Sequence, residues 1–342
     1  MFESVIEPKR PNWILRIFVA ALVITVAVAS VSVWRMCHMP LGSYRGPLPT
    51  LSASQSELAS RLQQDVQHLS REIGQRNLDH AGSMKITTDY LRGELSQLGY
   101  SVDEQNYLVE SQPVSNLEAQ LPGASPSEAI VIVGAHYDSV TGTVGADDNA
   151  SGVASVLELA RMLRGTRLRR TIRFVFFANE EPPCFQTDTM GSFVYARGLN
   201  NQRIPVSAMI SLETIGFYSD APGSQKYPPV LGLLYPSRGN FIGFVSNNES
   251  RDLLRRSIRS FRESAKFPSE GVAAPATWPG IGWSDQWSFW QFGYPAIMVT
   301  DTATFRDPYY HTLRDTTDKL DFSKMALVVD GMRSVITSLA NE

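Results

Sequence analysis

Four short apolar runs in this chain each contain or precede acidic or imidazole side chains, and this recurrence constrains the fold more than any other feature. The runs cover residues 129–135, 171–178, 206–215 and 295–300. Short runs rich in β-branched and aromatic residues are typical of buried strands. After the first run, apolar residues recur at helical spacing at Val153, Val156, Leu157, Ala160 and Leu163. Strands that alternate with helices predict an α/β fold, whose site lies beyond the carboxyl ends of the strands.

The first run is followed by His136 and Asp138 within the sequence GAHYDS. Residues two apart in an extended chain face the same side, so both side chains can point into one cleft. An imidazole ligand is commonly oriented by a carboxylate that accepts its second ring proton. This pattern predicts a metal ligand at His136 with Asp138 as its supporting group.

Two aspartates, Asp147 and Asp148, stand just before the predicted helix in the sequence GADDNASG. Asp and Asn are favoured at helix N-caps, where they accept the first free amide hydrogens, so capping is one interpretation. Metal binding is the other. The two interpretations are compatible, because Asp147 can bridge two metals while Asp148 or Asn149 caps the helix.

The second strand is followed directly by Glu180 and Glu181. Adjacent carboxylates repel each other, and a metal cation at the end of the strand would relieve that repulsion. One of the two can then bind the metal while its neighbour takes a proton from an activated water. Glu213 in the third run and His311 beyond the fourth complete a set of donors typical of zinc.

In the order His-x-Asp, Asp-Asp, Glu-Glu, Glu, His, the chain resembles the co-catalytic zinc aminopeptidases of peptidase family M28 from about Glu57 to its C-terminus. The family also contains bacterial leucyl aminopeptidases, glutaminyl cyclases and the metal-free transferrin receptor ectodomain. The resemblance implies a mixed, largely parallel central β-sheet sandwiched between helices, and two Zn²⁺ ions per chain. The metal ligands that it implies are His136, Asp147, Glu181, Glu213 and His311.

The resemblance also implies roles for the remaining site residues. Glu180 would be the general base, and Asp138 would support His136. Asp148 and Asp285 would support the site without binding metal. The family's Asp-Asp pair often carries a non-proline cis peptide bond, which predicts one between Asp147 and Asp148.

Three positions depart from the best-known secreted members. Glu213 stands where many have Asp, Gln286 where the family segment usually has His, and Ile281 where some members use a Tyr to stabilise the oxyanion. A tyrosine elsewhere would then have to donate to the oxyanion. The candidates are Tyr227, Tyr309 and Tyr310.

Three functions follow, from different classes. The first is a zinc aminopeptidase that hydrolyses N-terminal residues from peptides with a free amino group, using a metal-activated water and Glu180 as base. The second is a glutaminyl cyclase-like acyltransferase with a single zinc, which would have no need of His136 and Glu213. The third is a non-catalytic receptor-like relative, in which the ligand set would be lost.

Substrate specificity is expected to come from the Gly- and Pro-rich stretch between Ser219 and Ser284, which is predicted to cap the cleft. Aromatic side chains are candidate walls for an apolar pocket, although such residues also build protein cores. The candidates are Phe185, Tyr218, Trp278, Trp283 and Trp287.

The amino terminus contains an uncharged apolar run from Ile17 to Trp34, just long enough to cross a bilayer. Lys9, Arg10 and Arg16 precede the run, which predicts a cytoplasmic N-terminus and an extracytoplasmic domain, periplasmic or extracellular. The alternative is a signal peptide whose cleavage releases a secreted enzyme. The predicted segments are a cytoplasmic segment (1–16), a transmembrane anchor (17–36), a linker (37–55) and a zinc peptidase domain (56–342).

Composition excludes one class of partner. The formal net charge is −3 and 19% of residues are charged, without the basic tract that nucleic acid binding needs. Two cysteines are too few for a disulfide framework. The predicted partners are peptides and, through the apolar run, a lipid bilayer, while no pattern specifies an oligomeric state.

Overall fold

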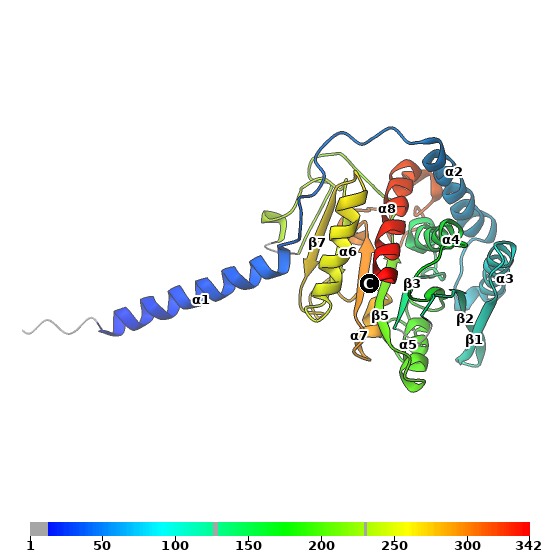
Figure 1. The fold of residues 1–342 in the computed structure, drawn as a ribbon, viewed down its shortest axis with the longest axis horizontal. Coiled ribbons are helices and arrows are strands. Elements are labelled where there is room, and N and C mark those ends of the chain that lie inside the picture. The colour runs from blue at the N-terminus through cyan, green and yellow to red at the C-terminus, as the bar shows by residue number, and fades with distance from the viewer. Residues whose placement is uncertain (1–12, 126–128, 229–230) are drawn as a thin grey trace, which may run out of the picture. The chain divides into compact units, whose positions relative to one another are not determined.

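A single mixed β-sheet organises the domain, and its strands alternate with helices as expected (Figure 1). The computed structural model describes residues 13–125, 129–228 and 231–342. Across the sheet the strands follow the order β1-β2-β4-β3-β5-β8-β6-β7. Their bounds are β1 Val102–Val109, β2 Gln112–Leu121, β3 Ile130–His136, β4 Ile172–Phe177, β5 Val206–Glu213, β6 Ile242–Ser246, β7 Ser269–Ala273 and β8 Ala296–Thr300.

The centre of the sheet is parallel and its margins are mixed. Strands β4, β3, β5 and β8 pair in parallel, so their carboxyl ends meet at one edge. Strand β2 runs antiparallel to β4 and to β1, and β6 runs antiparallel to β8 but parallel to β7. The predicted mixed, largely parallel sheet is therefore confirmed.

Helices cover both faces of the sheet. Their bounds are α2 Ala53–Gln67, α3 Ala81–Gln97, α4 Gly152–Leu163, α5 Gly191–Asn201, α6 Arg251–Ser264, α7 Gln286–Trp290 and α8 Phe322–Asn341. Side chains alternate between the two faces of β3 and pack into two hydrophobic cores. Val131 and Val133 lie in the larger core, and Ile130 and Ile132 in the smaller. Every residue of β3 is buried, which explains its continuous apolar sequence.

The four apolar runs correspond to β3, β4, β5 and β8, whereas β1, β2, β6 and β7 were not predicted. In β1 the exposed and half-buried residues outnumber the buried ones, so its sequence lacks an apolar run. Strands β6 and β7 each have only five residues. They lie within the stretch expected to cap the cleft.

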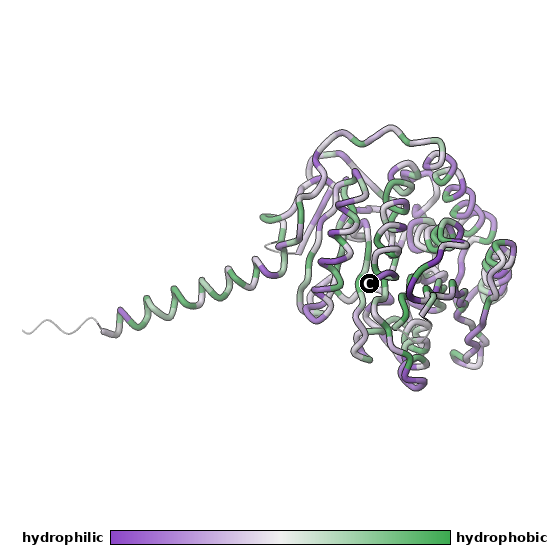
Figure 2. The backbone as a smooth tube through the Cα atoms, viewed as in Figure 1, coloured by the Kyte–Doolittle hydropathy of each residue, from purple (hydrophilic) through white to green (hydrophobic). Residues whose placement is uncertain are grey.

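The amino-terminal unit, Met1–His38, consists in its described part of helix α1, Trp13–Cys37. Its segment Leu15–Cys37 is long and apolar enough to cross a membrane, by length and composition, and none of it is buried. Figure 2 shows this helix as almost continuously hydrophobic. The basic residues Lys9 and Arg10, which carry the orientation argument, lie outside the described residues.

The second unit begins at Met39, within the segment expected to be a linker. Met39 is buried in the larger core, and Arg262 Nη1 donates to the carbonyl oxygens of Pro40 (3.0 Å) and Leu41 (2.8 Å). The backbone amide of Ser269 donates to Ser43 Oγ at 3.0 Å. Residues 39–43, which precede α2 in the sequence, are thus held against α6 and β7.

Candidate metal centre

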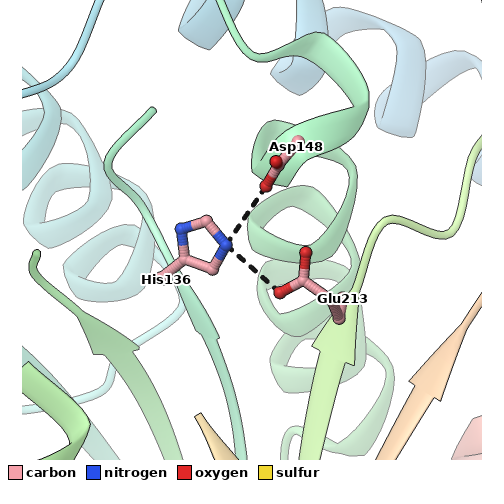
Figure 3. Close-up of side chains that lie close together, drawn as sticks. All are labelled: His136, Asp148 and Glu213. Atoms are coloured by element: carbon pink, nitrogen blue, oxygen red, sulfur yellow. Dashed lines mark ion pairs between the residues drawn. The ribbon is translucent and has the colours of Figure 1, made fainter. Parts of the chain in front are cut away.

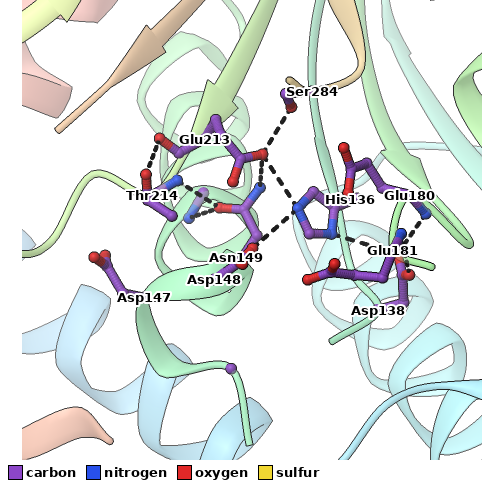
Figure 4. A network of polar contacts seen from close by, with 12 residues as sticks. His136, Asp138, Asp147, Asp148, Asn149, Glu180, Glu181, Glu213, Thr214 and Ser284 are labelled. Carbon is purple, nitrogen blue, oxygen red and sulfur yellow. Dashed lines mark hydrogen bonds and ion pairs between the residues drawn. The ribbon is translucent and has the colours of Figure 1, made fainter. Parts of the chain in front are cut away.

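Four of the five predicted ligands converge with Asp148 at the carboxyl edge of the parallel strands. Figure 4 shows three of them, His136, Glu181 and Glu213, beside Asp148. His136 ends β3, Glu213 ends β5, and Glu181 follows β4. His311 comes from the loop after β8, and Asp148 from the segment before α4. Parallel strands bring their ends to one edge, so residues spread over more than half of the chain meet there.

One group of donors surrounds His136. Its Nε2 atom lies 3.3 Å from Asp148 Oδ1 and 3.1 Å from Glu213 Oε2 (Figure 3). All three side chains are buried, and their ligand atoms lie within 4.8 Å of one another. Such a cluster can hold one cation.

A second group surrounds His311 and shares Asp148 with the first. His311 Nε2 lies 2.9 Å from Asp148 Oδ2 and 3.2 Å from Glu181 Oε1. The two oxygens of Asp148 therefore face different imidazoles. This is the arrangement of a carboxylate that bridges two cations.

Unpaired polar atoms show that the donors fit a metal pair. Both ring nitrogens of His136, both carboxylate oxygens of Asp148 and Oε1 of Glu181 are buried without a hydrogen-bond partner. Buried polar atoms are nearly always hydrogen-bonded, so orphans concentrated at one place need an explanation. Imidazole nitrogens and carboxylate oxygens are zinc ligands, and bound zinc would engage His136 Nε2, both oxygens of Asp148 and Oε1 of Glu181, while His136 Nδ1 faces Asp138.

The structure corrects the expected role of Asp147. Its Oδ1 atom accepts from the backbone amide of Gly216 at 2.8 Å, and its carboxyl group belongs to neither donor group. Figure 4 shows the Asp147 side chain pointing away from His136. The cause is the backbone of Asp148, which is not helical (φ −108°, ψ 91°), so the two neighbouring side chains project differently. Asp148, and not Asp147, lies between the imidazoles.

Two further details of this segment differ from or refine the prediction. The non-proline cis bond joins Asp148 and Asn149, one residue later than expected. Asn149 Oδ1 accepts from the backbone amides of Gly152 at the start of α4 and of Thr214 after β5, both at 3.1 Å. Of the two residues proposed as the helix cap, Asn149 is the one that caps α4. The same side chain also connects the start of α4 to the end of β5 by hydrogen bonds.

Asp138 supports the site through the backbone as well as through His136. Its Oδ1 lies 3.4 Å from His136 Nδ1, and its two oxygens accept from the backbone amides of Glu180 and Glu181, each at 3.0 Å. This carboxylate therefore fixes the adjacent glutamates. Glu180 is buried beside the donors but belongs to neither group, which leaves its carboxylate available for proton transfer.

The electrostatics of the metal-free site favour protonated imidazoles. Burial alone would lower the pKa of His136, but Glu213, Asp138 and Asp148 together raise it well above its usual value. For His311 burial is likewise outweighed, and Asp148 and Glu181 raise its pKa to about 10. Burial, together with the charge of Asp148, raises the pKa of Glu181 to about 8.

Among the candidate tyrosines, Tyr310 has the best position. Burial raises the pKa of its hydroxyl, as do the charges of Asp148, Glu181 and Glu213, because the hydroxyl lies near both donor groups. Its ring stacks on His311, with centroids 3.9 Å apart. The hydroxyl of Tyr227 instead donates to the carbonyl of Pro236 at 2.6 Å.

Tyr309 is positioned by other contacts. Its ring packs against Phe217, and the side chains of Arg314 and Lys319 lie over the ring face. These contacts hold the ring between two cationic side chains, so Tyr309 is the weaker candidate for a hydrogen-bond donor to the oxyanion.

The residues that depart from the family pattern pack together beside the site. Gln286 is fully buried, and its side-chain amide donates to the carbonyl of Ile281 at 3.0 Å. Asp285 is also fully buried, and burial raises its pKa to about 7, although the charge of His136 acts in the opposite direction. Asp285 belongs to neither donor group.

An apolar pocket opens beside Glu213 and Tyr310, with about 820 Å³ of empty space including its mouth. Its walls come largely from the stretch between Ser219 and Ser284, as predicted for the specificity region, and from the chain after β8. Of the aromatic residues predicted as walls, Trp283 lines the pocket. The apolar lining side chains include Leu231, Val245, Val272, Ile281, Met298 and Phe305.

Sequence reasoning missed several residues that hold the ligands. Ser284 Oγ donates to Glu213 Oε2 at 2.7 Å, and the carboxylate of Asp315 accepts from the backbone amides of Asp147 (2.8 Å) and Asp148 (3.1 Å). Arg76 is fully buried near the same segment. The position of Asp315, four residues after His311, was a weak sequence signal for a role at the site. The sequence around Arg76 contained no such signal.

The model of peptidase family M28 matches residues 116–336 of the chain. Over 291 residues the chain is 40% identical to the uncharacterized protein YfbL of Escherichia coli, covering 82% of this chain and 87% of that protein. It is 30% identical over 225 residues to a probable leucine aminopeptidase of Trichophyton verrucosum, covering 61% of this chain. The chain spans about half (53%) of that fungal protein's length.

Solved structures share the fold at low identity. The zinc aminopeptidase BSAP of Bacillus subtilis superposes with a TM-score of 0.66 at 15% identity, over 83% of this chain and 95% of that one. A glutaminyl cyclase of Fimbriiglobus ruber superposes with a TM-score of 0.60 at 21% identity, over 86% and 97% of the two chains. The fold therefore fits both activities, and the donor set has to distinguish them.

Proposed function

Because the chain belongs to peptidase family M28 and is by family a metallopeptidase, we propose that it is a membrane-anchored aminopeptidase that uses two zinc ions to remove N-terminal residues from peptides. The observation that carries this proposal is the pair of donor groups that share Asp148. His136 and Glu213 would hold one zinc, and Glu181 and His311 the other. Asp148 would bridge them.

When bound, two zinc ions polarise the scissile carbonyl group and lower the pKa of water. Glu180 is the base that receives the proton of the attacking water. In the metal-free site its pKa is raised well above its usual value, chiefly by burial and further by Glu181 and Glu213, while His136 acts in the opposite direction; the same burial gives the carboxylate a high affinity for a proton. Glu180 then gives this proton to the leaving amine, so the peptide nitrogen departs as a neutral group.

Tyr310 is the proposed donor to the oxyanion. The tetrahedral intermediate carries a negative charge, and a preorganised hydroxyl donor stabilises that charge more than it stabilises the planar carbonyl. The stack on His311 fixes the Tyr310 ring, and the pKa of the hydroxyl stays above its usual value, so it remains a donor at neutral pH. Ile281, the position where some relatives have the tyrosine, lines the apolar pocket instead.

The apolar pocket is proposed to take the side chain of the substrate's first residue. Leu exceeds Ala by three carbons, and burial of each is worth about 0.8 kcal/mol, or about 2.4 kcal/mol together. This difference corresponds to roughly sixtyfold in kcat/KM. We therefore expect N-terminal Leu to be removed much faster than N-terminal Ala.

A glutaminyl cyclase is the alternative enzyme, supported by the shared fold. A single-zinc cyclase needs the donors that surround His311 but not those that surround His136. Here His136 and Glu213 are buried with orphaned ring nitrogens on His136, and they would serve no purpose in such a cyclase. This observation favours two metals and hydrolysis.

The proposed location rests on helix α1. Its length and apolar composition support a single membrane-spanning anchor, and the basic residues before the apolar run are the argument for a domain outside the cytoplasm. A cleaved signal peptide with a secreted enzyme is the alternative. The intact mass of the mature protein, measured by mass spectrometry, distinguishes these two alternatives. A mass that includes residues 17–36 supports the anchor, and a mass without them supports secretion.

The test of function uses the full-length protein in detergent micelles, loaded with zinc and incubated with a peptide library. Stepwise loss of N-terminal residues from free but not acetylated peptides, detected by mass spectrometry, is the expected result. The matched control is Glu180→Gln, which should bind zinc and leave all peptides intact. Loss of ammonia confined to N-terminal Gln would identify a cyclase, and intact peptides with the unaltered protein would refute catalysis.

A further inference from the structure

Arg76 is a buried arginine whose guanidinium group bonds to backbone carbonyl oxygens. Its Nε donates to the carbonyl of Tyr137 at 2.7 Å, and its Nη2 to that of Gly145 at 2.9 Å. Its Nη1 donates to the carbonyls of Val144 (2.7 Å), Gly74 (2.9 Å) and Leu69 (3.0 Å). No part of the residue is exposed. A buried cation needs partners of this kind, and a carbonyl is a weaker partner than a carboxylate, so its position calls for a reason.

Three of the five carbonyls belong to segments that carry metal donors. Tyr137 stands between His136 and Asp138, and Val144 and Gly145 directly precede the segment that contains Asp148. Arg76 therefore joins the segment of the first imidazole to the segment of the bridging carboxylate. Its own backbone is fixed to the same region, since its amide donates to Ser139 Oγ at 3.1 Å and its carbonyl accepts from the Ser139 amide at 2.7 Å.

The fit between Arg76 and this segment leaves no space at Gly145. Gly145 has φ +56°, and a Cβ atom there would lie 2.2 Å from the carbonyl oxygen of Asp148 and 3.1 Å from Arg76 Nη2. Asp315 accepts from the amides of Asp147 and Asp148 in the same segment. The peptide groups before and within the Asp-Asp pair are thus held both by a cation at their carbonyls and by a carboxylate at their amides.

Charge gives Arg76 a second effect on the donors. Burial lowers its pKa to about 10, while the charges of Asp315, Asp138 and Asp148 oppose this, so the guanidinium stays positive at neutral pH. A fixed positive charge behind buried carboxylates favours their ionised form. It does so without occupying a donor atom, because the guanidinium bonds to the backbone.

We propose that Arg76 is a positioning residue for the metal pair: by bonding to carbonyls of both segments it fixes Asp148 relative to His136 before zinc binds. This inference rests on the proposed two-zinc site. Partners that orient metal ligands typically contribute ten- to hundredfold to metal affinity. Arg76 does not touch a metal ligand side chain and acts through the backbone beside it. It nevertheless positions Asp148, the bridging ligand on which both zinc ions would depend.

The experiment measures zinc affinity and stoichiometry of the metal-free, full-length protein by competition with a chromophoric chelator. The variants are Arg76→Met and Arg76→Lys. The matched control is Arg262→Met, because Arg262 is also largely buried and donates to backbone carbonyls, at Pro40 and Leu41, away from the donors. The absorption spectrum of the cobalt-substituted protein reports the coordination geometry independently of activity.

Arg76→Met is expected to bind zinc ten- to hundredfold more weakly and to alter the cobalt spectrum. Arg76→Lys should lie between Met and Arg, since an ammonium supplies three donors where a guanidinium supplies five. Arg262→Met should keep the unaltered protein's zinc affinity even if its melting temperature falls.

Unaltered zinc affinity in Arg76→Met would overturn the proposal, and so would an equal loss of affinity in Arg262→Met. If Arg76→Met does not fold, unaltered affinity in Arg76→Lys would overturn it. A failure of the unaltered protein to bind two zinc ions would refute the proposed metal site itself, which is a different result from normal zinc binding in the Arg76 variants.

Discussion

Removal of zinc is expected to destabilise the domain by an amount that depends strongly on pH. Each zinc present at 100 times its dissociation constant stabilises the native state by about 2.7 kcal/mol, and two sites by about 5 kcal/mol. The domain Met39–Glu342 has about 300 residues, so its unfolding entropy is roughly 0.6 kcal/mol/K. Chelation at pH 8 should therefore lower the melting temperature by about 8 °C.

The protonation of the imidazoles sets the pH dependence. The pKa of His311 in the metal-free protein is about 10, so its imidazole is protonated from pH 6 to pH 8, and the pKa of His136 is also raised well above its usual value. Zinc binds the neutral imidazole and the ionised carboxylate, so at the His311 site it must displace at least one proton, and Glu181 there also has a pKa raised to about 8. The apparent affinity of that site then falls at least about tenfold for each unit by which pH decreases. A zinc concentration of 100 times the dissociation constant at pH 8 at most equals that constant at pH 6, which leaves no more than about 0.4 kcal/mol at that site.

Differential scanning calorimetry with and without zinc, at pH 8 and pH 6, measures both effects. The expected shift of about 8 °C at pH 8 should shrink to about 5 °C or less at pH 6, because at least the His311 site loses most of its zinc stabilisation. The variant His136→Ala removes a proposed ligand and should show a smaller shift at pH 8. The control His68→Ala removes a half-buried imidazole that pairs with Glu72 and lies outside both donor groups, so its zinc-dependent shift should match that of the unaltered protein. Equal melting temperatures with and without zinc at pH 8 would refute the metal site, and a shift independent of pH would refute the protonated imidazoles.

The remaining predictions concern single side chains. Glu180→Gln should retain both zinc ions by elemental analysis while turnover of a leucyl peptide falls by several orders of magnitude; loss of zinc would show that base and ligand are misassigned. Asp148→Asn should bind zinc far more weakly than Asp147→Asn in chelator competition, and the opposite order would restore the original assignment of the bridge. Tyr310→Phe should lower kcat about a hundredfold with little change in KM, as loss of an oxyanion donor does, whereas Tyr227→Phe should leave kcat unchanged.

The central strands were predictable because both of their faces are buried. A strand such as β3, buried on both faces, must be apolar throughout, and its sequence is distinctive. Strand β1, at the edge of the sheet, alternates exposed and half-buried residues and carries Asp103, Glu104 and Gln105. Nothing in such a sequence separates it from a loop, so the antiparallel margin of the sheet could be seen only in three dimensions.

The chemistry of the site was predictable, but the choice between two adjacent aspartates was not. Asp147 and Asp148 are the same residue type at neighbouring positions, and their roles depend on the backbone torsion angles of Asp148. The sequence shows that two acidic residues are present at this point, but it does not show which of them points towards the imidazoles. Arg76 was missed for a related reason, since it bonds to backbone carbonyls, and a carbonyl leaves no trace in the sequence.

The same segment explains why the Asp-Asp pair stands between two glycines. Gly152 begins α4, and a Cβ atom there would lie 2.4 Å from the carbonyl oxygen of Leu212 and 2.3 Å from Asn149 Oδ1. The start of α4 therefore packs directly against the end of β5, where Asn149 Nδ2 also donates to the Leu212 carbonyl at 2.9 Å. Since Glu213 follows Leu212, any side chain at position 152 would push the bridging segment away from that ligand. The glycine sets the separation between Asp148 and Glu213, and so the space in which the first zinc would bind.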